Sequence, residues 1–588
     1  MTDIESAEDA PNPVAFWRDQ LKLSLRQDEQ FYKDGEVAVA RYRSVPLSDY
    51  VITDEGTTSK FNILWSNTET LKPAVYSALP SPDVRIRNFV TDMNDPAEKA
   101  RAEVANEASQ VLEKALSTTI DDGTFDVVMK ECRDDVLLPG RGQIRIRYEV
   151  EWENVIPEAV EEFQRNDDGE IETDADGPIV INRTFMHNGE PIEVERDDDG
   201  EIETNDADMP IARVKASEAV KAEYVFWGGY RQQPARNWAQ TDWIAYEHFM
   251  TREQLTEEFG SVGNDIPLES RREVGAKEEN KPGDTGIKVA RVWEIYDKTD
   301  EERVWIADGF DKLIEKEDDP LELVGFYPSP KPLTFYTTTD RTTPMSEYRF
   351  YQDQAIELDV VNARITRLIA LLKAVGAYDS LSDAVVDVIN LSDGELAPVD
   401  IGEEMRRQGG LAGSIFMWPL QTIAAVLSGL YEQRAALLVQ IYELTGISDL
   451  IRGQTAPSET LGAQKLKANF GSMRMTNRHQ PMQEFVRDTL RVMADMMAEN
   501  FEDETWARMT GMKISPAALE MIRDDHLRYF NVDIETDSTV TPDAEMQKQE
   551  AVEMATAIAQ YFTAVFPIAQ ADPRMVPFFL DLFKVVFR

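Results

Sequence analysis

The sequence predicts an α+β protein in which a mixed helix-and-strand region precedes a largely helical one. Up to residue 340, short alternating segments and amphipathic segments follow one another without a repeating βαβ rhythm. After it, three long stretches carry strong helix formers, two of them with apolar residues at helical spacing. With 588 residues, the chain has room for roughly three or four domains of ordinary size.

The chain is strongly acidic, with 109 acidic against 61 basic residues and a formal net charge of −48. Such a chain repels polyanions at long range, so conventional reading of a DNA sequence is not expected. The acids lie in solvated loops, or they face cations, or large interfaces overcome their repulsion; composition leaves all three open. The single cysteine, Cys132, excludes an internal disulfide and favours a buried apolar role in a reducing compartment.

The N-terminal segment MTDIESAEDAPNPVAF is acidic and lacks the basic and apolar regions of a signal peptide. No stretch reaches the ~18 uninterrupted apolar residues that suggest a membrane span. We therefore expect a cytoplasmic protein with no membrane contact.

Two helices are expected early in the chain. Apolar and charged residues alternate at helical spacing over residues 13–34, and Gly35 is expected to end this helix. A clear amphipathic helix covers residues 95–117, opened by Asp95 and Pro96.

Strand-like alternation follows in GQIRIRYEVEWENV, where one face would carry Ile144, Ile146, Tyr148 and Val150. Further on, residues 223–249 bring many aromatic side chains together. Such density favours a core or a subunit interface over a ligand site.

Two acidic segments repeat one another. RNDDGEIETDADGPI begins at Arg165, and RDDDGEIETNDADMPI begins at Arg196. Each contains an Asp-Gly turn dipeptide, which favours a pair of acidic hairpins within residues 165–211. Neither copy has the alternating ligands or the Glu six residues after its Gly that a calcium loop needs.

The first long helix is expected from Tyr348 to Val375, spanning ~42 Å. Its apolar residues recur at steps of three and four, which predicts a heptad seam. The seam residues are Leu358, Val361, Ile365, Leu368, Leu372 and Val375.

A second helix of ~38 Å is expected from Leu420 to Leu444. It shows the same rhythm, with Arg434 at the position that the apolar series skips. Its seam residues are Ile423, Leu427, Leu430, Leu437, Ile441 and Leu444. The matched lengths predict an antiparallel pair capped by a small module, although an ordinary helical hairpin in a bundle would look alike.

The second helix is expected to close at Gly446, and ISDLIRGQTAP after it has no sustained period. Ser458 is a good N-cap for a third helix from Glu459 to about Asn500. Between Gly446 and Arg491, seven basic residues outnumber four acidic ones, against the trend of the chain. These cations either approach a polyanion or form salt bridges with acidic neighbours.

Three stretches together resemble the portal protein of tailed bacteriophages, of the short-tailed-phage type. SEYRFYQDQAIELDVVNARI resembles the start of a portal stem helix. IYELTGISDLIRGQTAPSETLGAQKLKANFGSMRM resembles the return of the stem, the tunnel loop and the kinked helix after it. FNILWSNTETLKPAVYSALPSPDVRIRNF resembles an N-terminal wing segment, and VDIETDSTVTPD extends the likeness toward the C-terminus.

The resemblance implies a ring of about twelve copies with the portal fold: a mixed α/β wing, a two-helix stem, a small α/β clip and a helical crown. A closed ring needs two different, complementary faces on each subunit. The implied parts are a wing at 1–345, stem helices at 346–376 and 420–446, a clip at 377–419, a tunnel loop at 447–457, a long wing or tunnel helix at 458–504, and a crown at 505–588.

The resemblance also implies a channel at the capsid vertex of a virion, assembled in the host cytoplasm, through which the genome is packaged and ejected. The implied partners are double-stranded DNA, the terminase large subunit, head-completion or adaptor proteins, tail proteins, the major capsid protein and scaffold proteins. A mostly acidic bore would let DNA slide, because few phosphates would be neutralised. Divalent cations assisting assembly are a second hypothesis, motivated by the like charge.

The tunnel loop is the candidate DNA-facing site, and Leu450, Ile451 and Arg452 are expected to approach the duplex without reading bases. Glycines at its start and centre permit different backbone settings. The candidate residues are Ser448, Asp449, Leu450, Ile451, Arg452, Gly453, Gln454 and Thr455.

An enzyme is the first competing class. The chain has no Gly-x-x-x-x-Gly-Lys-[Ser/Thr] phosphate loop and no His-Glu-x-x-His motif, and its four histidines are widely spaced. We therefore expect no catalytic residues, no cofactor and no metal centre, although the many carboxylates leave a two-metal nuclease site formally open. The second competing class is a non-catalytic scaffold or adaptor of a large assembly with coiled-coil helices.

Overall fold

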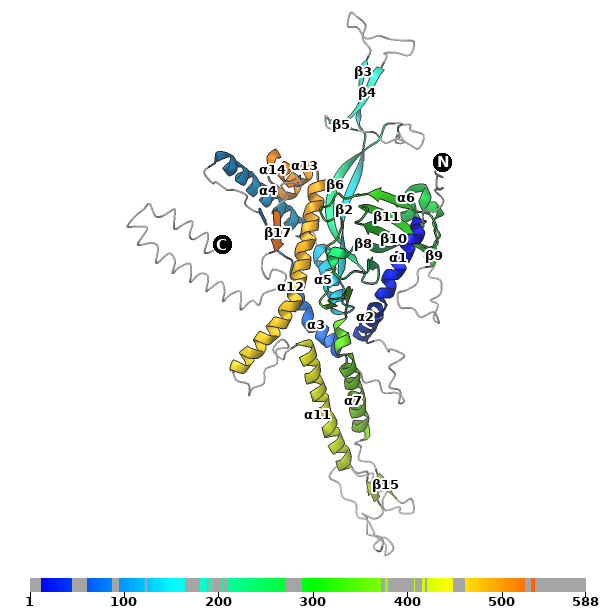
Figure 1. Ribbon diagram of the computed structural model, residues 1–588, viewed down its shortest axis with the longest axis vertical. Coiled ribbons are helices and arrows are strands. Elements are labelled where there is room, and N and C mark those ends of the chain that lie inside the picture. The colour runs from blue at the N-terminus through cyan, green and yellow to red at the C-terminus, as the bar shows by residue number, and fades with distance from the viewer. Residues whose placement is uncertain are drawn as a thin grey trace, which may run out of the picture.

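The computed structural model describes residues 12–44, 61–86, 95–121, 124–163, 180–187, 190–192, 194, 202, 204, 209–270, 288–371, 376–378, 407, 415–417, 420–447, 461–523 and 530–534. Within them the protein has the α+β class that the sequence predicts. A central body carries a two-stranded ribbon at one end and a pair of helices at the other (Figure 1).

The N-terminal helix is interrupted earlier than expected and then runs further. α1 (Pro13–Gln27) ends at Asp28, and α2 (Glu29–Tyr42) continues through Gly35. The predicted stop at Gly35 is therefore wrong. This glycine is used for close packing instead, since a Cβ there would lie 2.9 Å from the ring of Trp227.

An antiparallel sheet forms one half of the body, in the order β12-β11-β10-β8-β7, with β9 paired to β10. α1 covers one face, where Trp17 packs with Trp243 and Trp293. α6 packs on the other face through Leu255. The bounds are β7 (Tyr230–Gln232), β8 (Trp243–Met250), α6 (Arg252–Asp265), β9 (Glu269–Ser270), β10 (Lys288–Asp297), β11 (Glu302–Ala307) and β12 (Glu315–Asp318). Much of the aromatic cluster of residues 223–249 thus lies in the core.

Helices form the other half of the body around one large core. Asp95 caps α4 as expected, its carboxylate accepting a hydrogen bond from the backbone N–H of Ala97 at 2.9 Å. Cys132 is buried in this core, as predicted. The elements are α3 (Ile63–Val75), β1 (Pro82–Ile86), α4 (Pro96–Asp121), α5 (Thr124–Leu137), α12 (Leu461–Asn500), α13 (Asp503–Thr510), α14 (Pro516–Arg523) and β17 (Phe530–Ile534).

Residues 503–523 and 530–534 belong to this same core. Trp506, Leu519 and Val532 are buried beside side chains of α4, and β17 pairs antiparallel with β1. The resemblance assigns residues from 505 onward to a separate crown. The described ones among them, 505–523 and 530–534, pack instead in the core of the predicted wing.

The ribbon consists of β2 (Gln143–Val155) paired antiparallel with β6 (Ala212–Val225), with a bulge between Glu151 and Trp152. Beyond it, β3 (Glu158–Phe163), β4 (Val180–His187) and β5 (Glu190–Ile192) form a small sheet (Figure 1). β3 and β4 flank the first acidic repeat, but both Asp-Gly turns lie outside the described residues.

The opposite end carries the strut, which we define as α7 (Gln352–Leu371) and α11 (Leu420–Thr445). The first helix starts later than expected, because Tyr348 lies in the 3-10 turn η3 (Glu347–Phe350). Its expected end, Val375, lies outside the described residues, and Gly376 starts a strand. That strand, β15 (Gly376–Tyr378), pairs antiparallel with β16 (Ile415–Met417) beyond the helices. Apart from these strands and Arg407, the expected clip lies outside the described residues.

Three short elements remain. They are η2 (Trp238–Gln240), β13 (Thr337–Thr338) and β14 (Arg341–Pro344). Among the described residues, no helix is both long and apolar enough to cross a membrane.

Candidate functional site: the strut and its junction with the body

The two strut helices meet along the seam that the heptad pattern predicts. Six seam residues are buried in one cluster: Leu358, Val361, Ile365, Leu430, Leu437 and Ile441. Leu368 and Leu427 pack against this cluster while partly exposed, and Ile423 is partly exposed. The last two predicted residues of the first helix, Leu372 and Val375, lie outside the described residues.

Leu444 does not belong to the seam, because its side chain is 50% exposed. Thr445 is buried instead, and its hydroxyl donates to the carbonyl of Ile441 at 2.9 Å. A straight helix turns once in 3.6 residues, so a 3.5-residue repeat drifts around it. The step after Ile441 is therefore four residues rather than three.

Polar contacts fix the register of the strut. Arg434, at the position that the apolar series skips, donates through Nε to Asn362 Oδ1 at 2.9 Å. Its guanidinium also lies over the ring of Phe61, 5.2 Å from the ring centre. Gln433 donates to Glu357 at 2.9 Å. Arg434 therefore links both helices to the segment that precedes α3.

A buried ion pair holds the base of the strut to the body. Arg41 of α2 donates to Asp359 of α7 at 2.5 Å. The other carboxylate oxygen of Asp359 accepts from the backbone N–H of Phe61 at 3.0 Å. Because both charged groups are largely shielded from water, their geometry constrains how α7 leaves the body.

We use the term junction for a second buried contact, made by Glu347, Thr445 and Arg478. Arg478 Nη2 donates to Glu347 Oε1 at 2.5 Å and to the carbonyl of Thr445 at 2.7 Å. Burial raises the pKa of Glu347, and Arg478 opposes that rise. Arg478 of α12 thus connects Glu347, just before the first strut helix, to Thr445, at the end of the second.

The chain leaves the strut along a fixed path. Gly446 has φ of 73°, the left-handed conformation that commonly ends helices, and its N–H donates to the carbonyl of Tyr442 at 2.8 Å. Ile447 is then fully buried in the core of the body. The expected tunnel loop therefore begins at an anchored residue.

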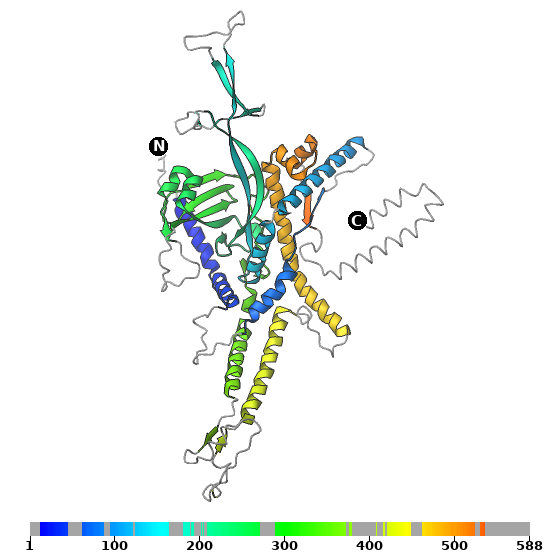
Figure 2. The same cartoon turned by 180° about the vertical axis from the view of Figure 1, so that it is seen from behind.

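α12 bends near the point where it projects from the body (Figures 1 and 2). Pro481 lies inside this helix and has no N–H to donate to the carbonyl four residues earlier, so a bend is expected there. After Pro481 the helix is packed in the core through Met482, Phe485 and Val486. Arg478 lies one turn before the bend.

The basic excess around the tunnel loop is partly neutralised. Arg478 is only 3% exposed and paired with Glu347, so it serves the junction rather than a polyanion. Arg487 and Arg491 lie 3.4 Å and 3.1 Å from Asp488. These three arginines follow the salt-bridge interpretation of the sequence.

All eight candidate loop residues, from Ser448 to Thr455, lie outside the described residues. The side chains of Lys465, Lys467 and Arg474 also lie outside the described residues. Of the predicted loop, 447–457, the structure describes Ile447 alone, and α12 begins beyond the loop at Leu461. Sequence reasoning did not find the junction, since nothing local distinguishes Glu347 or Thr445 from other polar residues.

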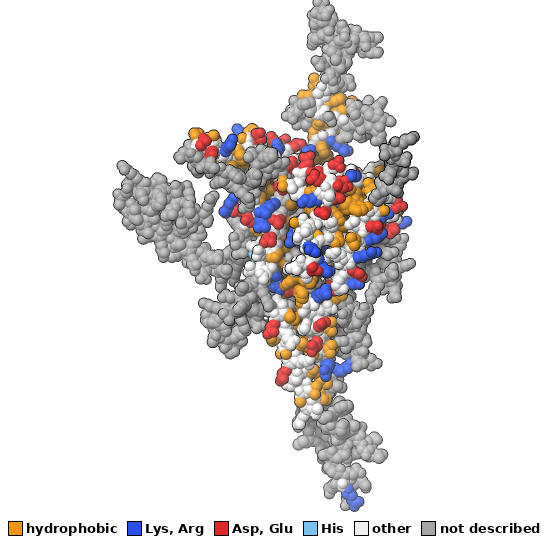
Figure 3. All heavy atoms as spheres, viewed as in Figure 1, with side chains coloured by type: hydrophobic (Ala, Val, Ile, Leu, Met, Phe, Trp, Pro, Cys, Tyr) orange, Lys and Arg blue, Asp and Glu red, His pale blue; other side chains and the backbone are white. Residues whose placement is uncertain are grey.

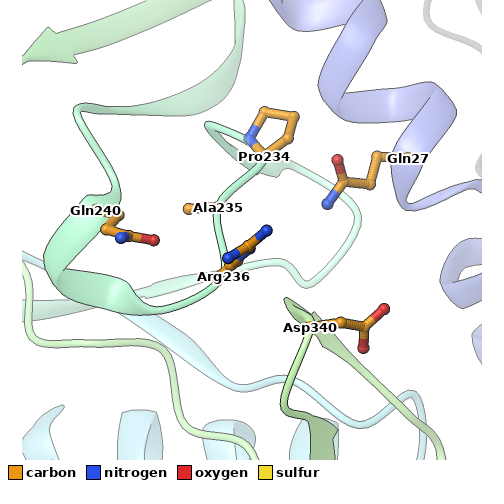
Figure 4. Close-up of a pocket in the computed structure, with 6 residues that line it drawn as sticks. All are labelled: Gln27, Pro234, Ala235, Arg236, Gln240 and Asp340. Carbon is orange, nitrogen blue, oxygen red and sulfur yellow. The ribbon is translucent and has the colours of Figure 1, made fainter.

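Among the described residues, a pocket and a cluster of carboxylates are two further candidates for a ligand or metal site. A hollow of about 410 Å³ is lined by Gln27, Pro234, Ala235, Arg236, Gln240 and Asp340 (Figure 4). Its lining has one cation, one carboxylate and two amides, but no pairing of a nucleophile with a base. It therefore has no arrangement for covalent or acid–base catalysis.

The carboxylates of Asp297, Asp300 and Glu302 lie within 4.8 Å of one another. Burial raises the pKa of Asp297, and the neighbouring acids add to the rise. The ammonium group of Lys316 lies against Glu302 and supplies part of the missing positive charge. Acidic groups of this kind are common without a metal, so the group by itself assigns no site.

No protein-family model matches the chain, and no curated protein shows significant similarity to its sequence. Function therefore has to be inferred from the strut, the junction and the distribution of charge.

Proposed function

We propose that the protein is a portal: identical subunits form a ring at a capsid vertex, and duplex DNA passes through the ring during packaging and ejection. The observation that carries the proposal is the strut, a pair of helices that extends from the body with one side of each helix buried and much of the outer surface of α11 apolar.

α11 has only three charged residues in its 26 positions: Glu432, Arg434 and Glu443. Away from the seam it exposes large apolar side chains, namely Val426, Tyr431, Val439 and Leu444. Figure 3 shows that apolar and uncharged atoms cover much of the strut in that view. A monomer gains nothing from such a surface, so its expected cover is the strut of another copy.

The two strut helices present different outer surfaces. α7 exposes charged residues, among them Asp353, Glu357 and Arg364, whereas α11 exposes mainly apolar and small ones. Two unlike faces on one subunit support a head-to-tail contact, which closes into a ring when the rotation between copies allows it. An isologous dimer would pair like faces instead.

The junction supports the conduit part of the proposal. It holds Thr445, next to the predicted loop, against Arg478, which precedes the bend of α12. A loop held in this way can line the bore of a ring while its supports stay rigid. With a net charge of −48, the ring would hold DNA weakly and without sequence preference.

The proposal implies a portal's partners: the terminase large subunit, head-completion or adaptor proteins, tail proteins, and the capsid and scaffold proteins. We propose no catalytic step for this chain. The packaging energy would come from the motor that docks on the ring.

Deleting residues 448–456 tests the conduit. We expect rings of normal size but impaired DNA packaging or retention, because the supports of the loop are unchanged. A deletion of equal length at residues 272–280, remote in sequence from the strut, serves as the matched control. Normal DNA filling by the 448–456 variant would remove the loop from the mechanism.

A further inference from the structure

The hollow that Arg236 lines lies between the N-terminal helices and the chain segment that leads into the strut. Gln27 ends α1, Arg236 belongs to the loop after β7, and Asp340 belongs to the turn between β13 and β14. β14 is followed almost directly by η3 and then by α7. A ligand in the hollow would therefore contact the part of the body from which the strut starts.

The loop that carries Arg236 is held by hydrogen bonds on both sides. The backbone N–H of Thr342 donates to the carbonyl of Ala235 at 3.1 Å. The side-chain oxygen of Gln233 accepts from the backbone N–H of Asp242 at 2.6 Å. A loop held in this way needs little reordering when a ligand binds.

The walls that carry the two amides are held as well. η2 carries Gln240, and the ring of Trp238 in the same turn lies 5.6 Å from the ring of Tyr327, measured between ring centres. The end of α1 is joined to β14 by a hydrogen bond of 2.7 Å from the hydroxyl of Thr343 to Asp28. The hollow is therefore preformed on every side that carries a polar group.

Arg236 supplies a positive charge that the protein leaves unpaired. Its side chain is exposed and forms no ion pair or hydrogen bond with another residue that the structure describes. Asp340 is engaged elsewhere, because Arg341 lies 3.1 Å from one of its oxygens and the hydroxyl of Thr338 donates to the other. Two arginines against one aspartate leave a single positive charge here, in a chain of net charge −48.

The polar groups of the hollow are arranged around Arg236. Figure 4 shows the amides of Gln27 and Gln240 extending toward Arg236 from opposite sides, whereas the carboxylate of Asp340 points away from it. A guanidinium offers two parallel N–H groups that match the two oxygens of a carboxylate, and each amide offers further N–H donors. The arrangement suits an anion that is held chiefly by the arginine.

A single positive charge suits a carboxylate better than a phosphate. A phosphate group carries nearly two negative charges, and the lining of the hollow has no second cation to balance them. A small free carboxylate would be poorly enclosed, since Arg236 and Gln240 are both exposed, whereas small-molecule sites cover most of their ligand. A carboxylate presented by a protein surface meets both conditions.

We propose that the hollow binds an aspartate or glutamate side chain of the neighbouring copy in the ring. This inference rests on the proposed function, because head-to-tail closure places a different face of the next subunit against each face of the first. Like charge on every copy makes close approach costly. A preformed site with an unpaired arginine converts one of these carboxylates into an attractive contact and fixes the register between copies.

Cross-linking with a carbodiimide tests the contact directly. Arg236→Lys places an amine in the hollow, and a carbodiimide joins an amine to a carboxylate that touches it. Rings are assembled from equal parts of isotopically labelled and unlabelled chains of this variant, and peptides that contain position 236 are analysed by mass spectrometry. We expect such peptides to be joined to an acidic peptide of the other isotopic form in rings, and not in the unassembled chain.

The isotopic labels separate the possible outcomes. Joined peptides of mixed isotopic form show a contact between copies. Joined peptides of one isotopic form only, for example with Asp340, or no joined peptide although micrographs show closed rings, would overturn the inference and leave the ring intact. If the unmodified chain forms no ring, the proposed function itself fails, so the two failures are distinguished.

Removing the charge provides a second test. Arg236→Gln should raise the protein concentration for half-maximal ring formation about tenfold at low salt, because a charge-assisted contact is lost at every interface. Its denaturation midpoint as a monomer should not change, since the side chain contacts no other described residue. Arg26→Gln is the matched control: Arg26 is also exposed and adjoins Gln27, but it does not line the hollow. Equal assembly of the two variants would contradict the inference.

Two small probes test the class and the source of the ligand. N-acetylglutamate and inorganic phosphate are titrated into the unassembled chain by calorimetry, and we expect only weak, millimolar binding of either. Micromolar binding of N-acetylglutamate that Arg236→Gln abolishes would show that the hollow serves a free carboxylate instead of a neighbouring copy. Tighter binding of phosphate that depends on the same arginine would show that the ligand class is wrong.

Discussion

The body and the strut differ in how far each covers its own apolar side chains. In the body, sheet faces and helices enclose several buried clusters, so one chain covers its own apolar surface. In the strut, two helices cover only one side of each other, and Val439 on the opposite side is 54% exposed. The body therefore encloses most of its apolar surface, whereas the strut leaves much of the apolar surface of α11 exposed.

Buried charge marks the boundary between these regions. Arg41 with Asp359, and Arg478 with Glu347, both lie where the strut joins the body. Such pairs add little net stability compared with apolar packing, but they are costly to break. Their position suits a joint that keeps one geometry between the strut and the body.

Arg478→Met should have the largest effect, because it leaves the carboxylate of Glu347 buried without its cation. We expect the free energy of unfolding to fall by about 3–5 kcal/mol in chemical denaturation. Adding Glu347→Gln should recover part of this loss. Arg487→Met, at a partly exposed arginine beside Asp488, is the control and should change stability by no more than about 0.5 kcal/mol. An equal fall in the free energy of unfolding for the two arginine variants would contradict the claim that the buried pair at the junction costs more to break than a surface pair.

Leu437→Ala should follow, at a cost of about 2–5 kcal/mol, because it opens a cavity in the seam. Hydrogen exchange measures this effect locally: the amides of α7 and α11 should exchange faster, while those of the body sheet keep their protection. Loss of protection in the sheet as well would contradict the separation of body and strut.

Asp135→Asn should affect the body alone, in a pH-dependent way. Burial raises the pKa of Asp135 to about 7, and its carboxyl group accepts from the Tyr224 hydroxyl at 2.5 Å. The folded state therefore holds a proton between about pH 4 and pH 7 that the unfolded state has released, so stability falls as the pH rises through this window. The variant should lack this decline and be more stable at pH 8 by about 2–4 kcal/mol. Parallel pH profiles for variant and parent would refute the assignment.

Val439→Ser should change the stability of the monomer least, by no more than about 0.5 kcal/mol, since the side chain already faces solvent. Its effect should appear in assembly: sedimentation should show a higher protein concentration for half-maximal ring formation. Unchanged assembly would mean that this side of α11 contacts no neighbour.

Local patterns predicted the parts of the fold that depend on local repeats. The heptad spacing located most of the seam, and alternation located β2, because burial on one side of a regular element imposes its period on the sequence. Gly35 was misread because Trp227, which packs against it, lies far away in the chain. The membership of residues 503–523 and 530–534 in the body depends on packing against α4 and on the pairing of β17 with β1, which no local pattern reveals.

The junction could not have been predicted for the same reason. Glu347 and Arg478 are 131 residues apart, and each looks like an ordinary surface charge in its own segment. The predicted burial of Leu444 was wrong for another reason. A 3.5-residue repeat drifts around a helix that has 3.6 residues per turn, so after a few turns its positions no longer face the partner helix. The roles of the tunnel-loop residues and the terminase and tail partners stay predictions.

Electron micrographs of the purified, full-length protein test the central claim most directly. The account predicts annular particles of about twelve subunits, with an axial hole wide enough for duplex DNA and the struts clustered around that axis. Solid particles, or monomers whose two strut helices fold back against the body, would contradict it.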